Sequence, residues 1–107
     1  NRFPLDREWL QKAASILPDA KVGAFVTVQE CSGTDALGIE RGERFAAVCE
    51  NMEGAAAAHL CALYEVPFVE VRAMSNRVEA RNRDTWDLPL ALGEAQAAAT
   101  RLLEEGL

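Results

Sequence analysis

The sequence predicts an α/β fold in which short apolar strands alternate with helices. β-Branched apolar runs predict strands at residues 21–30, 45–49 and 68–74. The segments between them carry helical patterns, and two strands joined through a helix are typical of a parallel crossover unit. Three strands do not make a stable open sheet with helices on both faces. Additional strands are therefore expected from missing residues or from another chain.

The first and last helices have the clearest sequence signals. Asp6 can cap the first helix and Pro18 ends it; Asp87 can cap the last, and Gly106 closes it. The stripe of the first helix is Trp9, Leu10, Ala13, Ala14 and Leu17, and that of the last is Leu88, Leu92, Ala95, Ala99 and Leu102. Each stripe needs an apolar partner.

Two further helices are expected between the predicted strands. A short one should begin at a Ser32 or Thr34 cap, run to about Arg41 and stop at Gly42. A second, at residues 52–64, has almost no polar face, so it should be buried between layers. His59 within it is interpreted as a packing histidine.

Length and charge limit the possible functions. The 107 residues make one domain at most, and the net charge of −6 disfavours nucleic acid or an anionic membrane as the main partner. No apolar run approaches the roughly 20 residues of a membrane helix, so a cytoplasmic protein is expected. Because the chain begins with Asn1 and a helix, it is expected to be the C-terminal part of something longer.

Cysteine usage predicts neither a disulfide framework nor a zinc site. Cys31, Cys49 and Cys61 are odd in number and lack metal-ligand spacing. All three are interpreted as small buried apolar residues. No cofactor or metal is expected.

Two polar residues stand at the ends of neighbouring strands and are the first candidates for a ligand site. Glu53 follows the second strand at a helix N-terminus, where it can cap the helix or accept hydrogen bonds from a vicinal diol such as ribose. Asn76 follows the third strand, where it can form a turn or offer a donor and an acceptor to a ligand. Ser75 can orient Asn76 or cap the turn.

Aromatic and basic residues around these strands have two interpretations each. Trp86 can be a hydrophobic staple for the last helix or a lid over the crevice. Arg72 is expected to pair with Glu70 or Glu50. The loop arginines are either solvated or available to an anion: Arg77, Arg81 and Arg83.

Two motifs resemble a known superfamily over residues 22–103. The sequence NMEGAAAAHLC at residues 51–61 resembles the helix start of the purine nucleoside phosphorylase and methylthioadenosine/S-adenosylhomocysteine nucleosidase superfamily. The sequence VPFVEVRAMSN at residues 66–76 is similar to that superfamily's strand ending in Ser-Asp. The resemblance implies a three-layer αβα fold with a mixed sheet, of which residues 1–107 would be the C-terminal portion, with the N-terminal half absent.

Asn76 is the main departure, because adenine-specific nucleosidases carry Asp there. With the residues that follow, it resembles the futalosine hydrolase branch, which releases hypoxanthine in menaquinone biosynthesis. Hypoxanthine presents a 6-oxo acceptor that an amide N–H can meet and a carboxylate would repel. An unmatched buried acceptor costs about 1–3 kcal/mol, enough for roughly ten- to hundredfold discrimination.

The resemblance also implies roles for individual residues. Glu53 would bind the ribose hydroxyls, Met52 would pack against the sugar, and Asn76 would hold the purine and stabilise the departing base. Trp86 would close over the 5′ side of the ribose. Cys31 and Ser32 fall where family members contact the purine, although the preceding residues depart from the usual Gly-Asp.

The resemblance leaves alternatives open. The glutamate that activates water in the family has no match here, so the chain alone should bind poorly and hydrolyse nothing. A phosphorylase or a methylthioadenosine/S-adenosylhomocysteine nucleosidase is the nearest alternative, and a non-catalytic remnant acting by association is another. The expected partners are a small purine nucleoside and either further copies of the chain, as a homo-oligomer, or the missing N-terminal half.

Overall fold

The computed structural model describes residues 2–78 and 86–107 of the chain. The elements, in order, are α1 (Arg7–Ile16), β1 (Ala24–Thr27), α2 (Asp35–Phe45), β2 (Ala47–Asn51), α3 (Gly54–Leu63) and α4 (Leu88–Glu104). No helix in these two ranges is long and apolar enough to cross a membrane.

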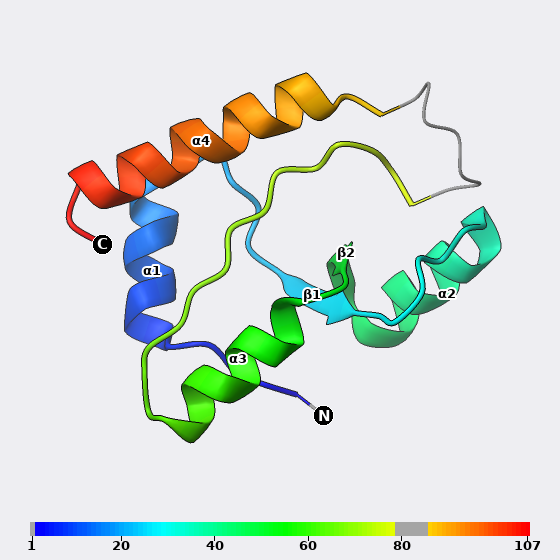
Figure 1. The fold of residues 1–107 in the computed structure, drawn as a ribbon, viewed down its shortest axis with the longest axis horizontal. Helices are drawn as coiled ribbons and strands as arrows, with labels where there is room; N and C mark the ends of the chain where they lie inside the picture. The colour runs from blue at the N-terminus through cyan, green and yellow to red at the C-terminus, as the bar shows by residue number, and fades with distance from the viewer. Residues whose placement is uncertain (1, 79–85) are drawn as a thin grey trace.

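A parallel crossover forms the centre of the molecule (Figure 1). β1 and β2 pair in parallel and α2 connects them. Thr27 lies opposite Asn51 in this pairing, and the Val28 N–H donates to the Asn51 carbonyl at 2.9 Å. The predicted α/β class is confirmed, although both strands are shorter than or shifted from the sequence-based ranges.

α2 is longer than expected. The Thr34 hydroxyl caps it by accepting from the Leu37 N–H at 3.3 Å, but the helix continues through Gly42 to Phe45. The predicted stop at Gly42 is wrong, since a glycine inside a helix costs only about 1 kcal/mol. Instead Ala46, in the left-handed region with φ 48°, ends the helix.

α1 and α4 pack against each other and form an apolar core. The Asp6 carboxylate accepts from the Trp9 N–H at 2.9 Å, and the Asp87 carboxylate accepts from the Leu90 N–H at 3.0 Å, so both predicted caps are confirmed. The buried members of the core are Ala13, Ile16 and Leu102. The Lys12 ammonium donates to the Gly106 carbonyl at 2.7 Å and joins the middle of α1 to the chain just past the C-terminal end of α4.

The predicted third strand is extended but unpaired. Residues 67–74 cross the middle of the molecule between α3 and α4 (Figure 1), and within the described ranges they join no strand ladder. A β-strand is defined by its neighbour's hydrogen bonds, and β1 and β2 pair with each other instead. The sheet of the described residues therefore has two strands.

The prediction that the helix at residues 52–64 is buried is also wrong. α3 begins at Gly54, and Leu60 and Leu63 are 56% and 68% exposed. Only Gly54 and Ala58 of this helix are buried in the described structure. The apolar sequence required a covering layer, and the described residues do not supply one on this face.

Candidate functional site

Two side chains from the neighbouring strands cap α3. The Asn51 carboxamide oxygen accepts from the Gly54 N–H at 2.7 Å, and the Thr27 hydroxyl accepts from the Ala55 N–H at 2.9 Å. The Thr27 hydroxyl also donates to the Asn51 oxygen at 3.1 Å. The first N–H groups of α3, which a helix leaves without partners, are thus satisfied by residues at the ends of β1 and β2.

Glu53 occupies the N-cap position of α3 without capping it. In the described structure its side chain accepts no cap hydrogen bond, because Asn51 and Thr27 already take that role. The capping interpretation of Glu53 is therefore wrong. Its carboxylate is exposed and lines a cleft, at the helix end where the dipole stabilises negative charge.

This cleft has a volume of about 610 Å³ and lies between the start of α3, the extended segment and α4. Its lining residues are Glu53, Gly54, Ala57, Phe68, Val69, Glu70, Val71, Arg72, Ala73, Ser75, Leu88, Ala91, Leu92 and Ala95. It therefore combines an apolar wall with a carboxylate, a hydroxyl and an ion pair. Such a combination is typical of small-molecule sites.

The ion pair in the cleft joins Glu70 and Arg72. The Arg72 Nε donates to Glu70 Oε1 at 2.6 Å, which confirms the predicted pairing. Glu70 also lies directly against the backbone of Gly54: a Cβ built at that position would be 2.6 Å from both carboxylate oxygens. The start of α3 and the extended segment approach this closely because residue 54 has no side chain.

Ser75 orients Asn76, as one of the two sequence interpretations predicts. The Ser75 hydroxyl donates to the Asn76 carboxamide oxygen at 2.6 Å, and the Asn76 amide donates to the Arg77 carbonyl at 2.8 Å. Ser75 lines the cleft, whereas Asn76, half-buried, lies beside it. Arg77 is exposed, and the other two loop arginines, Arg81 and Arg83, fall outside the described residues.

Cys31 and Met52 lie next to each other, with the Cys31 Sγ at 4.0 Å from the Met52 Sδ. Both residues are exposed. The prediction that all three cysteines are buried is wrong for Cys31, and it is confirmed for Cys49; Cys61 is half-buried. The structure thus brings together two of the candidate residues beside Glu53.

Ser32 has polar partners that the sequence did not reveal. Its N–H and hydroxyl donate to Glu50 Oε1 at 3.1 and 2.8 Å, and Arg41 bonds both Glu50 and the Ser32 hydroxyl. Ser32 is buried. These contacts join residues distant in sequence, so residue spacing gave no signal for Arg41 or Glu50.

Trp86 directly precedes the N-cap of α4, and His59 lies within α3. Trp86 is half-buried and directly precedes the Asp87 cap, the position of a hydrophobic staple, and it is not among the described residues that line the cleft. The His59 ring stacks on Phe3 with centroids 4.9 Å apart, but His59 is exposed, so its packing is confined to this surface contact among the described residues.

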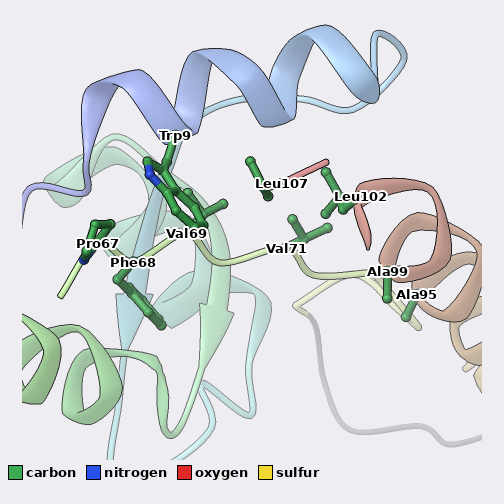
Figure 2. A pocket seen from close by; sticks show the side chains of 9 residues that line it. All are labelled: Trp9, Pro67, Phe68, Val69, Val71, Ala95, Ala99, Leu102 and Leu107. Atoms are coloured by element: carbon green, nitrogen blue, oxygen red, sulfur yellow. The ribbon is translucent and has the colours of Figure 1, made fainter. Parts of the chain in front are cut away.

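A second cavity, of about 340 Å³, lies between α1, the extended segment and α4 (Figure 2). Its walls are apolar: Trp9, Pro67, Phe68, Val69, Val71, Ala95, Ala99, Leu102 and Leu107. Because no charged side chain lines it, it is a gap in the core rather than a reactive site. Among the described residues, no group of three or more His, Cys, Asp or Glu side chains could hold a metal ion.

We expect thiol reagents to label Cys31 much faster than Cys49. Burial raises the pKa of the Cys49 thiol, and nearby Glu70 and Glu50 raise it further against the opposing effect of Arg72. A raised pKa leaves less of the nucleophilic thiolate at pH 8, and the buried sulfur is also inaccessible. Labelling followed by peptide mass spectrometry measures this. Equal rates at the two sites in the native protein would contradict it.

The chain resembles known proteins over almost its whole length. The model of the phosphorylase superfamily matches residues 1–106. Over 105 residues the chain is 37% identical to a futalosine hydrolase of Thermus thermophilus, covering 98% of this chain and 46% of the relative. It is 38% identical to futalosine hydrolases of Acidothermus cellulolyticus (76% of this chain, 34% of the relative) and Streptomyces coelicolor (85% and 37%). The chain spans less than half the length of these relatives, and it belongs to the phosphorylase superfamily.

Proposed function

We propose that this chain is the C-terminal part of a purine nucleosidase that cleaves the N-glycosidic bond of futalosine and releases hypoxanthine, in the cytoplasm, for menaquinone biosynthesis. The observation that carries the proposal is the Glu53 carboxylate, exposed in the cleft because other residues cap α3. The similarity to three futalosine hydrolases supports the choice of substrate.

In this proposal the sugar and the base meet different elements. Glu53, at the start of α3, accepts hydrogen bonds from the ribose hydroxyls, and Met52 packs against the sugar. Trp86 closes over the 5′ side, and Cys31 with Ser32 flanks the purine. The Ser32 hydroxyl and N–H already have polar partners, so its contribution to the base would come through the backbone carbonyl.

Asn76 is proposed to recognise the 6-oxo group of the base. Its carboxamide oxygen accepts from Ser75, which fixes the NH₂ group as the side available to a ligand. One hydrogen of that NH₂ goes to the Arg77 carbonyl, and an amide has a second. A donor at this position suits an oxygen acceptor and stabilises negative charge on the departing base.

The group that activates water is proposed to come from an N-terminal half, which pairs with residues 1–107 and extends the two-stranded sheet. The unpaired segment at residues 67–74 and the exposed apolar face of α3 support this pairing. A homo-oligomer is proposed for the assembled enzyme.

The test is hypoxanthine release from futalosine by the full-length protein. Release without added phosphate supports the proposal. Turnover that requires phosphate would identify a phosphorylase, and activity on methylthioadenosine without hypoxanthine release would identify an adenine-specific nucleosidase. Either result overturns the proposed reaction.

We expect the substitution Asn76→Asp to shift the full-length protein toward adenine nucleosides. The carboxylate repels a 6-oxo group and accepts from a 6-amino group, so the ratio of kcat/KM for futalosine to that for methylthioadenosine should fall roughly ten- to hundredfold. Steady-state kinetics on both substrates measure it. An unchanged ratio would refute the role given to the amide.

A further inference from the structure

Arg41 connects three parts of the chain near the proposed site. From α2, its Nη1 lies 2.7 Å from Glu50 Oε1 on β2, 2.9 Å from the Ser32 hydroxyl and 3.1 Å from the Glu30 carbonyl. Glu50 Oε1 also accepts from the Ser32 N–H and hydroxyl. The loop after β1 is therefore attached to β2 and α2 through one carboxylate and one guanidinium.

The same loop lies against Met52, the residue that precedes Glu53. Cys31 precedes the buried Ser32 and contacts Met52 at 4.0 Å, and Met52 is the chain neighbour of Glu53. The Val28 N–H bonds the carbonyl of Asn51, which caps α3. Fixing Ser32 thus fixes the position of Cys31 against Met52.

We propose that Arg41 and Glu50 are positioning residues that hold residues 28–33 so that Cys31 and Met52 form one wall of the nucleoside site. This inference rests on the proposed function. The two residues touch no substrate. They act on the wall by holding Ser32, whose backbone and side chain are both bound to Glu50.

The burial of the pair separates it from an ordinary surface ion pair. The side chains of Arg41 and Glu50 are 23% and 12% exposed, and their atoms are 2.7 Å apart. On the same helix, Arg44 and Glu40 are 68% and 52% exposed and 3.7 Å apart. The exposed pair holds no loop, so Arg44→Ala is a control with the same change of residue and charge.

The experiment compares wild type, Arg41→Ala, Arg44→Ala, Glu50→Ala and Glu50→Gln in the full-length protein with futalosine as substrate. A displaced wall weakens binding of substrate and transition state alike, so Arg41→Ala and Glu50→Ala should raise KM about tenfold with kcat within about twofold. Glutamine keeps the Oε1 acceptor, so Glu50→Gln should recover most of this loss. Arg44→Ala should match wild type.

A purely structural role gives a different result. Partial unfolding lowers the active fraction and hence the apparent kcat, and it leaves KM unchanged. That pattern overturns the positioning role alone. The same holds if the wild type hydrolyses futalosine and the KM of the Arg41→Ala protein equals that of the Arg44→Ala protein. A wild type that does not hydrolyse futalosine overturns the proposed function and this role with it.

Discussion

Replacing Glu53 by glutamine is expected to lower kcat/KM of the full-length protein for futalosine by about 10- to 100-fold, with little change in melting temperature. Hydrogen bonds to a charged acceptor contribute about 1.5–3 kcal/mol, and each 1.4 kcal/mol is a factor of ten. Stability should change little, because the Glu53 side chain caps no helix in the described structure and only its interaction with the helix dipole is lost. Steady-state kinetics and thermal denaturation measure the two effects.

Asp6→Ala is the matched control, since that carboxylate does cap a helix, by accepting from the Trp9 N–H. It should lower the free energy of unfolding by about 1 kcal/mol and leave kcat/KM unchanged. If Glu53→Gln instead lost stability like Asp6→Ala and retained its activity, Glu53 would be a structural residue.

Gly54→Ala is expected to destabilise the protein by about 1–3 kcal/mol, the usual cost of overpacking. The added methyl group would lie 2.6 Å from both Glu70 oxygens and 2.9 Å from the Asn51 carboxamide oxygen. Arg72 holds the Glu70 carboxylate in place, so the carboxylate cannot move without breaking that ion pair. Urea denaturation of wild type and variant measures the loss.

Gly93→Ala provides the control within α4, because nothing lies within 4 Å of a Cβ at that position. There alanine should stabilise the protein by up to about 1 kcal/mol through its higher helix propensity. Adding Glu70→Ala to Gly54→Ala should recover part of the loss. A Gly54→Ala protein as stable as wild type would show that α3 and the extended segment are not in close contact.

Local chemistry made part of this fold predictable. The caps at Asp6, Thr34 and Asp87 follow from side chains that compete for helix N–H groups within a few residues. The extended segment at residues 67–74 was correctly assigned an extended conformation, but its pairing depends on a neighbour that sequence pattern cannot supply. The prediction that α3 is buried is wrong for the same reason, because burial also depends on a neighbouring layer.

The candidate site was predictable where a polar side chain interrupts an apolar pattern. Glu53 stands out in this way, and Asn76 does so at the end of an apolar run. Thr27 and Asn51 do not stand out in the sequence. They cap α3 only because the parallel register places them opposite each other. Arg41 gives no such signal, since nothing in a linear sequence reveals that it reaches the loop after β1.

The chain continues from α3 to Asn76 through a segment whose described backbone hydrogen bonds to other parts of the chain lie near its two ends. The Val66 N–H bonds the Cys61 carbonyl at 2.8 Å, and the Asp87 N–H bonds the Ser75 carbonyl at 2.8 Å. A strand that pairs with residues 67–74 would also set their register, and a slip of one residue moves a strand by about 3.3 Å and reverses its faces. Choice of base in the proposed enzyme would then depend on correct strand assembly as much as on the identity of the side chain at position 76.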